Sequence, residues 1–384
     1  MKISSWPNYN DKICNSLVKI LKSGKVNYWT GNENKIFENK FKNYFGINYA
    51  LSISNGTAGL FLALKAFNLK KDSEILITPR SYYSSASTIL LNGYSPKFID
   101  IALDSQNIML SEIKRNITKK TKAIICVHLN GYPCDMVEIM KFAKKKNLFV
   151  IEDCSQAHGA MIGSKHVGSF GDISVWSFCQ DKIISTGGEG GMLGVSNFSL
   201  FKKLWSLKDQ GRDFNKSNKK SNNKFRYIHD HLGYNFRMTE IQAKIGTIQL
   251  DYLKNWVKIR NYNSNFIISL LKKYPQIFYV DKLNSNYTHS YYRLCVRLKI
   301  NKTKVSQILK QCFINKLEVY TGPCPEIYKE QTFKKILGNK LKLKNAHYLS
   351  GRTISFLVDH TISKKNMISF LKKFESIIKN LTIK

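Results

Sequence analysis

Short apolar runs alternate with amphipathic stretches through the first two thirds of the chain. Seven of these runs predict strands, at residues 49–54, 74–78, 96–101, 123–129, 148–153, 173–178 and 191–196. Between them, residues 57–67 and 135–146 repeat apolar side chains at the spacing of a helix. Strands that are almost wholly apolar and alternate with helices predict a mostly parallel sheet covered on both faces, which is an α/β fold.

The last third of the chain follows a different pattern. A long helical stretch at residues 238–260 is followed by an alternating strand at 290–300, a helix near 303–315, a strand at 352–358 and a closing helix at 364–379. We therefore expect a large domain at residues 1–255 and a smaller C-terminal α/β domain at residues 256–384. The polar, low-complexity residues 215–224 predict an exposed loop.

The composition is that of a globular protein. Of the 384 residues, 43% are hydrophobic and 12% aromatic, enough for a sizeable core. No apolar run approaches the roughly 18 residues of a membrane helix, and the N-terminus lacks the apolar segment of a signal peptide. None of the eight cysteines forms a CxxC pair, which argues against a zinc site or a redox dithiol. We expect a cytoplasmic protein with reduced thiols, no metal and no membrane contact.

The net charge of +35 allows two interpretations. One is nucleic-acid binding or attraction of an anionic substrate. The other is a scatter of lysines over every exposed face, as a low-GC genome would produce. The second is favoured, because the lysines do not form one block and lack the interleaved aromatic residues of RNA-binding segments. An attraction for phosphorylated small molecules follows from either interpretation.

Polar residues follow three of the expected strands, at the edge of the sheet where ligands bind. In SNGTAGL (54–60), Gly56 and Thr57 open a helix, whose free N–H groups attract anions, although an ordinary helix cap would look the same. Asp153 ends the strand LFVIED. A carboxylate there is costly unless a cation or donors meet it, and capping a helix is the alternative role.

The third strand leads into SFCQDKIISTGGEGG (177–191), which holds Ser177 and Lys182. This is not a Walker A loop, because there the lysine follows the glycines. Here the glycines come after Lys182. They favour a close passage of the backbone and its return into the strand at 191.

One cofactor requires all of these groups together. Pyridoxal phosphate needs a cup for its phosphate, a carboxylate that keeps its pyridine nitrogen protonated, an aromatic ring against its own, and a lysine amine that condenses with its aldehyde as a Schiff base. The sequence offers candidates for each of these requirements.

The chain resembles the DegT/DnrJ/StrS-type sugar aminotransferase family, which has the fold of type I pyridoxal-phosphate enzymes. The likeness is carried by the segments 28–41, 54–64, 78–87, 121–136, 151–191 and 232–250. The segment from IEDCSQAHG to ISTGGEGG is the most specific, because order, spacing and residue types match at once. The likeness fades towards the C-terminus but persists.

The resemblance implies a role for each of the candidates. Lys182 stands at the position of the Schiff-base lysine that also shuttles the proton, and desolvation and nearby cations should lower its pKa. Asp153 matches the partner of the pyridinium nitrogen, and Gln156 matches the side chain near the ring hydroxyl. Gly56, Thr57 and Ser177 match the phosphate cup.

Two further positions follow from the same resemblance. Tyr83 falls where the family stacks an aromatic ring on the cofactor, with Tyr82 as the alternative if the register shifts by one. Asn235, in GYNFRM, matches an asparagine that reaches the cofactor phosphate of the neighbouring subunit, which implies a homodimer with shared active sites. From the residues alone, GYNFRM is only a turn before a helix.

The implied reaction moves an amino group from an amino acid, with glutamate expected, to a keto-sugar that is expected to be nucleotide-linked. The products would serve surface polysaccharide synthesis. Relatives with histidine in place of the lysine act as dehydratases, so Lys182 favours transamination. The alternatives are an aminotransferase for a cyclitol or small keto-alcohol, and a basic DNA-binding regulator, for which no helix-turn-helix is found.

Three positions leave the substrate open. Gln210 stands where histidine is frequent in the family, and FLVDHTI (356–362) departs from a tail that often ends in His-Pro-Thr. His158 is either a substrate contact or a structural residue. Glu189, among the glycines, has no role beyond the turn.

Overall fold

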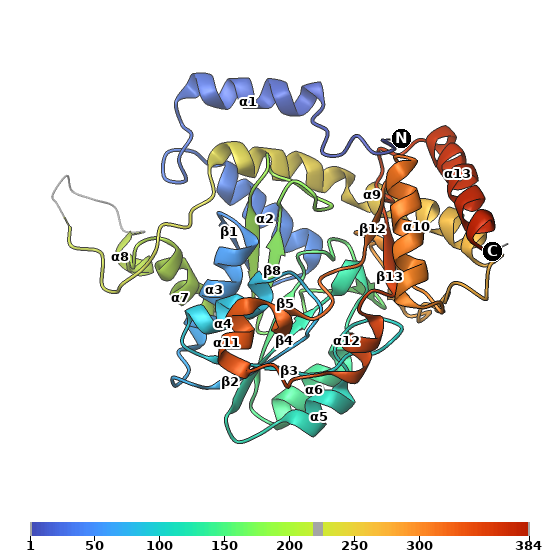
Figure 1. Cartoon of the computed structure of the whole chain (residues 1–384). Coiled ribbons are helices and arrows are strands. Elements are labelled where there is room, and N and C mark those ends of the chain that lie inside the picture. Colours follow the sequence, from blue (N-terminus) through green and yellow to red (C-terminus); the bar gives the residue numbers. More distant parts are fainter. Residues whose placement is uncertain (1, 218–225, 383–384) are drawn as a thin grey trace.

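The centre of the molecule is a seven-stranded sheet in the order β1-β9-β8-β5-β4-β2-β3 (Figure 1). The computed structural model describes residues 2–217 and 226–382. The strands are β1 (Tyr49–Ile53), β2 (Glu74–Ile77), β3 (Ser95–Phe98), β4 (Thr121–Val127), β5 (Phe149–Asp153), β8 (Ile173–Ser177) and β9 (Gly191–Val195). Only β9 runs antiparallel to its neighbours in this sheet. The expected strands and the mostly parallel sheet are confirmed.

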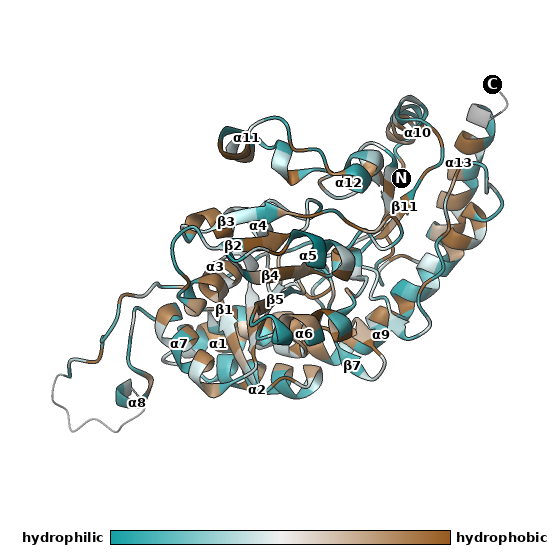
Figure 2. Ribbon diagram, turned by 90° about the horizontal axis from the view of Figure 1, so that it is seen from below, coloured by the Kyte–Doolittle hydropathy of each residue, from teal (hydrophilic) through white to brown (hydrophobic). Residues whose placement is uncertain are grey.

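Helices cover both faces of this sheet. One face carries α3 (Gly56–Phe67), α4 (Ser84–Leu91) and α7 (Phe198–Lys208), and the other carries α2 (Glu33–Phe45), α5 (Leu110–Asn116), α6 (Met136–Lys145) and α9 (Glu240–Leu271). Successive strand residues point to opposite faces. In β2, Ile75 and Ile77 join the core under α3, whereas Leu76 joins the core under α9. β2 and β4 are accordingly coloured mostly as hydrophobic in Figure 2.

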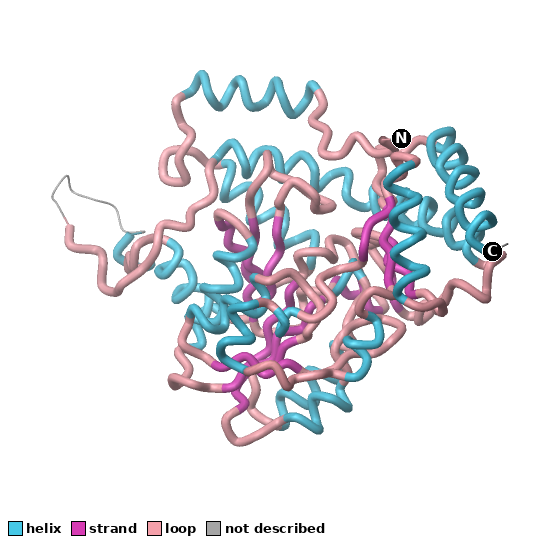
Figure 3. Tube along the Cα trace, in the orientation of Figure 1, coloured by secondary structure: helices cyan, strands magenta, loops and turns pink. Residues whose placement is uncertain are grey.

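A second, smaller unit is built from the C-terminal part of the chain (Figure 3). Its antiparallel sheet has the order β11 (Leu294–Arg297), β13 (Thr353–Phe356) and β12 (Val319–Thr321), and it packs with α10 (Lys302–Ile314) and α13 (Lys364–Thr382). The strand expected at 290–300 is shorter, because residues before Leu294 bond to the large sheet's loops: Ser290 N–H donates to Gly131, and Tyr292 N–H donates to Asn130.

The remaining elements are short, apart from α1. They are α1 (Asp11–Ser23), which lies on α9, α8 (Phe214–Ser217), α11 (Gln331–Leu337), α12 (Lys344–Leu349), the strands β6 (Met161–Ile162), β7 (Lys165–His166) and β10 (Tyr287–Thr288), and 3-10 turns at Leu129–Gly131 and Ile327–Lys329. None of the helices in the described ranges is long and apolar enough to cross a membrane. Most of the polar segment expected as a loop, residues 218–224 of 215–224, lies outside the described residues.

The expected division at residues 255 and 256 falls inside α9. This helix contributes Val257 to the core of the large sheet and Ile267 to the core of the small unit. Segments also cross between the units: Ile3 packs into the small core, and Phe333 packs into the large one. The boundary at residue 255 therefore stays a prediction, although two separate cores are present.

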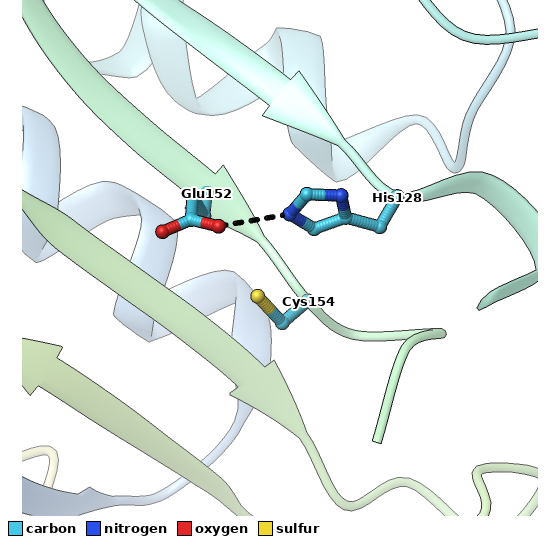
Figure 4. A group of neighbouring side chains, drawn as sticks. All are labelled: His128, Glu152 and Cys154. Carbon is cyan, nitrogen blue, oxygen red and sulfur yellow. Dashed lines mark hydrogen bonds and ion pairs between the residues drawn. The ribbon is translucent and has the colours of Figure 1, made fainter. Parts of the chain in front are cut away.

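Two neighbouring carboxylates end β5 and point to opposite faces. Asp153 lines a cavity, whereas Glu152 is fully buried beside His128 and Cys154 (Figure 4). His128 Nδ1 accepts the N–H of Cys134, so the other ring nitrogen, Nε2, carries the proton that is donated to Glu152 Oε2 at 3.1 Å.

Three backbone N–H groups also reach Glu152. They belong to Gly168, Phe170 and Gly171, at 2.8, 2.8 and 2.6 Å. Ligating atoms of His128, Glu152 and Cys154 lie within 4.8 Å of one another, but the histidine and the carboxylate are engaged in these bonds. Burial raises the pKa of Cys154 well above its usual value. The group therefore serves to tie the loop at 168–171 to β5.

Replacing Glu152 by glutamine tests this structural role. An amide presents one acceptor instead of two, so at least one buried N–H loses its partner, at a cost of about 1–3 kcal/mol. We expect a clearly lower midpoint of thermal unfolding, measured by circular dichroism. Glu33→Gln, which removes a partly exposed pair with Lys244, is the control and should have little effect. Equal midpoints for Glu152→Gln and the native chain would contradict the assignment.

Candidate active site

A cavity of about 740 Å³ opens where several strands of the large sheet end. It is lined by segments that follow β1, β5 and β8, by Tyr292 and Arg293, and by residues 321–324 after the start of β12. Six of the eight residues singled out from the sequence meet here: Gly56, Thr57, Asp153, Gln156, Ser177 and Lys182. Tyr83 and Asn235 are not among the lining residues. The sheet edge thus assembles most of the expected set.

The start of α3 forms an anion cradle with the end of β8. Asn55 caps the helix, since its side chain accepts the N–H of Ala58 at 2.8 Å. This cap leaves the first two N–H groups of the helix, those of Gly56 and Thr57, at the cavity wall. A Cβ on Gly56 would lie 2.8 Å from Cβ of Ser177, so only glycine lets the two segments approach this closely. Helix N–H groups and the Ser177 hydroxyl suit a phosphate.

Asp153 is held in one orientation. Its Oδ2 accepts the hydroxyl of Ser85 at 2.9 Å, and its Oδ1 accepts the N–H of Ser155 at 3.1 Å. Ser85 in turn pairs with Ser81 at 2.9 Å. The buried carboxylate keeps an edge towards the cavity, where it suits the protonated nitrogen of an aromatic ring. The alternative role as a helix cap is not found, since no helix begins at the residues after it.

Gln156 contacts the loop at Asn130, to which the segment before β11 also bonds. Its Oε1 accepts the N–H of Asn130 at 2.7 Å, which leaves the amide nitrogen as the group that can donate. Because Gln156 lines the cavity, this donor suits a ring hydroxyl or a substrate oxygen.

Lys182 is mostly buried, with 15% of its side chain exposed. Its Nζ lies 3.2 Å from Oδ1 of Asp181 and 4.8 Å from the centre of the Tyr292 ring, and the Tyr292 hydroxyl donates to Asp181. Burial lowers the pKa of Lys182, but Tyr292 and Asp181 outweigh it, so the pKa is raised. The sequence-based expectation of a lowered pKa for Lys182 is therefore wrong for the chain as this structure shows it. That expectation considered burial and nearby cations, but not Asp181 and Tyr292, which act in the opposite direction.

The N-terminal segment holds the backbone of the Lys182 loop from behind. The indole of Trp6 donates to the carbonyl of Lys182 at 2.8 Å, and the hydroxyl of Tyr9 lies 3.3 Å from that of Ser185. The Ser185 N–H donates to Gln249 of α9 at 2.9 Å. Trp6 itself packs edge-on against Trp256, at 5.3 Å between ring centres. No signal in the sequence links residue 6 to residue 182.

The expected ring position needs a correction. Tyr83 turns away from the cavity, because its hydroxyl donates to Thr332 at 3.0 Å and its ring packs on Phe333. Tyr82 lines the cavity instead and is 72% exposed. Tyr83 begins the turn into α4, so adjacent side chains point in different directions. The geometry favours Tyr82, the neighbouring alternative, as the ring partner, and its stacking role stays a prediction.

Asn235 is displayed on a braced loop outside the cavity. It forms an isolated bridge with Asp209, and the next residue, Phe236, accepts the N–H of Ser54 at 2.9 Å and donates to Lys208 at 3.0 Å. The bond between Phe236 and Ser54 brings the segment of Asn235 near the start of α3, and the side chain of Asn235 is exposed. The predicted contact of Asn235 with the cofactor phosphate would lie between two subunits, and it stays a prediction.

The glycine-rich return has the spatial role expected of it. A Cβ on Gly191 would lie 2.8 Å from the backbone of Asn55 and 2.9 Å from that of Trp176, so this residue lets β9 pass between β1 and β8. The carbonyl of Glu189 accepts from Thr186 at 2.7 Å and from Gln242 at 2.8 Å, and Glu189 also lines the cavity. The turn is thus fixed on α9.

His158 and Gln210, whose roles were left open, do not line the cavity. His158 is fully buried against Phe178 and does not line the cavity; burial, with Lys182 and Arg260, lowers its pKa to about 3. This supports the structural role. Gln210 has a positive φ of 59° and donates its N–H to Tyr234, so it shapes the braced loop rather than the cavity.

Three cavity residues were missed by the sequence reasoning: Asp181, Tyr292 and Arg293. Tyr292 and Arg293 lie in a run whose alternation predicts a strand, and Asp181 has no sequence signal apart from standing next to Lys182. With these residues included, the cavity combines an anion cradle, a fixed carboxylate, a donor amide and a mostly buried lysine. This set fits pyridoxal phosphate.

Comparison with known proteins points in the same direction. The sequence profile of the DegT/DnrJ/EryC1/StrS aminotransferase family matches residues 7–374. A GDP-perosamine synthase from Escherichia coli O157:H7 is 39% identical over 256 residues, 65% of this chain and 68% of the relative. A dTDP-3-amino-3,6-dideoxy-alpha-D-galactopyranose transaminase from Aneurinibacillus thermoaerophilus is 33% identical over 76% of each chain. The X-ray structure of the aminotransferase from Psychrobacter cryohalolentis is 34% identical, with a TM-score of 0.94 over 99% of this chain and 100% of that one.

The substitution Asp181→Asn tests the electrostatic setting of the lysine. Removing the carboxylate removes one of the two main influences that raise the pKa of Lys182, so the free amine should persist to lower pH. Competitive acetylation of the cofactor-free protein across a pH series, followed by mass spectrometry of the Lys182 peptide, measures this shift. Asp251→Asn, which only breaks a surface pair with Lys40, should leave the labelling curve of Lys182 in place. A curve for Asp181→Asn that is unmoved or moves to higher pH would refute the assignment.

Proposed function

This chain belongs to the DegT/DnrJ/EryC1/StrS aminotransferase family, and from that premise we propose that it transfers an amino group from glutamate to a keto-sugar carried on a nucleotide. It is an aminotransferase that depends on pyridoxal phosphate. The observation that carries the proposal is the position of Lys182, mostly buried in a cavity between an anion cradle and a fixed carboxylate. The relatives named for GDP- and dTDP-linked amino sugars support the choice of acceptor. We propose that the product serves polysaccharide synthesis.

When bound, pyridoxal phosphate supplies an aldehyde that takes up the amino group and a ring that withdraws electrons from the reacting carbon. We propose that Gly56, Thr57 and Ser177 hold its phosphate. In the same proposal, Asp153 holds the ring nitrogen in its protonated form. The hydrogen bonds from Ser85 and Ser155 orient this carboxylate, so it is preorganised for the cofactor.

Lys182 would then act through its Nζ, first as the group that captures the cofactor and later as a base and acid. Asp181 and Tyr292 stabilise the ammonium form, which favours holding a proton at Nζ once one has been taken from the substrate carbon. The proton can be returned to a neighbouring atom without leaving the cavity. Burial of the lysine limits exchange of this proton with water.

The size and the walls of the cavity suit a sugar acceptor. Pockets for small molecules are usually about 300–1,000 Å³, and this cavity of about 740 Å³ is within that range. Thr321, at the end of β12, and Gly322 and Cys324 after it also line the cavity. A cyclitol or small keto-alcohol is the second candidate for the acceptor, with no feature of the cavity that favours it.

We further propose a homodimer in which Asn235 of one subunit contacts the cofactor phosphate held by the other. The loop is rigidly braced, yet it presents Asn235 and, three residues before it, Leu232, which is 94% exposed. An exposed apolar side chain next to a braced polar one suits a protein interface. All eight cysteines are free thiols, which suits a reducing compartment, and we propose the cytoplasm.

Lys182→Ala should abolish transamination and covalent capture of the cofactor. The reconstituted native enzyme should absorb near the visible edge, and borohydride should fix pyridoxal phosphate to the Lys182 peptide. The variant should lose this labelled peptide and at least about a thousandfold of its turnover, since a missing nucleophile and base cannot be replaced by solvent. Lys203→Ala removes an exposed lysine and is the control. A cofactor label that persists in Lys182→Ala would show that another amine is the nucleophile.

The shared site can be tested by mixing two inactive variants. Lys182→Ala and Asn235→Ala are each expected to be impaired, but a mixed dimer has one site with both native residues. Refolding equal amounts together should restore roughly a quarter of native activity, because half of the dimers are mixed and each has one intact site. Mixing Lys182→Ala with Ser177→Ala is the control, because both residues line the cavity of the same subunit. Each of the two sites in this mixed dimer therefore carries one substitution.

In that control neither of the two sites is fully native, so no recovery of activity is expected. Recovery in the control alone, or none in the Asn235 mixture, would contradict a shared site. Native-like activity of Asn235→Ala by itself would remove Asn235 from the phosphate site.

A further inference from the structure

Among the described residues, two cationic side chains line the cavity, and only one of them pairs with a carboxylate. Lys182 is tied to Asp181 and Tyr292. The other is Arg293, which takes part in none of the ion pairs found in the described ranges. A guanidinium at a cavity wall without a carboxylate partner is available to an anionic ligand.

Arg293 and the reactive lysine share an aromatic neighbour, Tyr292. Its guanidinium lies 5.5 Å from the ring centre of Tyr292 and 5.2 Å from that of Tyr320. Tyr292 is the residue whose ring lies 4.8 Å from Nζ of Lys182. The ring of Tyr292 thus contacts both the guanidinium and the amine that takes part in the exchange.

The backbone at this point is also fixed. The N–H of Tyr292 donates to Asn130 at 2.9 Å, and β11 begins directly after Arg293, at Leu294. Arg293 also acts on Asp181, the neighbour of the lysine: burial raises the pKa of Asp181, but Lys182, Tyr292 and Arg293 outweigh it and lower the pKa. The positive charge of Arg293 therefore acts across the reacting region of the cavity.

The two substrates differ in where they carry negative charge. In an amino acid, the α-carboxylate is bonded to the carbon that carries the amine, so it must lie close to Lys182 when the amine is transferred. In a nucleotide-linked sugar, the diphosphate is attached to another carbon of the ring and lies farther from the reacting carbonyl. A planar guanidinium matches a carboxylate through two parallel hydrogen bonds.

We propose that Arg293 binds the α-carboxylate of the amino-acid donor and so orients the amine towards Lys182. This inference rests on the proposed function, because it assumes an amino acid as donor. It makes Arg293 a determinant of donor specificity: it favours donors with a carboxylate beside the amine over simple amines.

The test uses cofactor-loaded enzyme and three substitutions. Arg293→Gln removes the charge, and Arg293→Lys keeps the charge but loses the planar fork of donors. Arg297→Gln is the matched control, because Arg297 lies four residues further on, in β11, pairs with Asp281 and does not line the cavity. The first half-reaction is followed as the spectral change on adding glutamate alone. Arg293→Gln should raise the glutamate concentration for half-maximal rate about 10- to 100-fold, with Arg293→Lys in between and Arg297→Gln unchanged.

A binding measurement separates the donor from the acceptor without any turnover. Glutarate carries the carboxylates of glutamate but no amine, and GDP and dTDP carry the diphosphate of the acceptor. In calorimetric titrations, Arg293→Gln should weaken glutarate binding about 10-fold or more and leave nucleotide binding within about twofold of native.

The outcomes distinguish a failure of the role proposed for Arg293 from a failure of the proposed function. Native enzyme that reacts with glutamate, together with an Arg293→Gln variant that reacts equally well, overturns the role of Arg293 and leaves the proposed function intact. Loss of GDP or dTDP binding with glutarate binding retained assigns Arg293 to the diphosphate and also overturns the inference. Native enzyme that takes no amine from glutamate or another amino acid overturns the proposed function, and the inference with it.

Discussion

The contact between Lys182, Asp181 and Tyr292 is the constraint on which the active site depends, because it joins the two cores of the molecule at the reactive atom. Asp181 and Lys182 follow β8 of the large sheet, whereas Tyr292 comes from the segment that leads into the small sheet. Since Tyr292 and Asp181 raise the pKa of Lys182 against the effect of burial, the basicity of the lysine depends on how the small unit sits on the large one. A shift of the small unit would change the lysine's chemistry as well as the size of the cavity.

The large sheet provides the fixed half of the site. Because β5 and β8 are parallel, Asp153 and Ser177 end at the same edge, and the start of α3 reaches that edge because glycines allow close approach. The opposing side chain of β5, Glu152, is satisfied by His128 and three backbone N–H groups. Two adjacent carboxylates can therefore both be buried, one structural and one facing the cavity.

Sequence reasoning found what depends on local pattern and missed what depends on contact across the chain. Periodicity located all seven strands of the large sheet, and the family resemblance located six residues that line the cavity. It favoured Tyr83 over Tyr82, of which Tyr82 is the one that lines the cavity, because spacing does not distinguish adjacent residues at the start of α4. It missed Tyr292 and Arg293, since their segment bonds to the loop at Asn130 and Gly131 instead of continuing β11, and it misjudged the pKa of Lys182 for the same reason.

The hydrogen bond from Trp6 to the carbonyl of Lys182 has a practical consequence. Indole emission responds to hydrogen bonding and to the polarity around the ring, and Trp6 is one of only five tryptophans in the chain. Its ring also packs against Trp256 of α9 and His360 beyond β13. The protein therefore contains an intrinsic optical probe, placed directly behind its reactive lysine, that reports on order in the Lys182 loop without an added label.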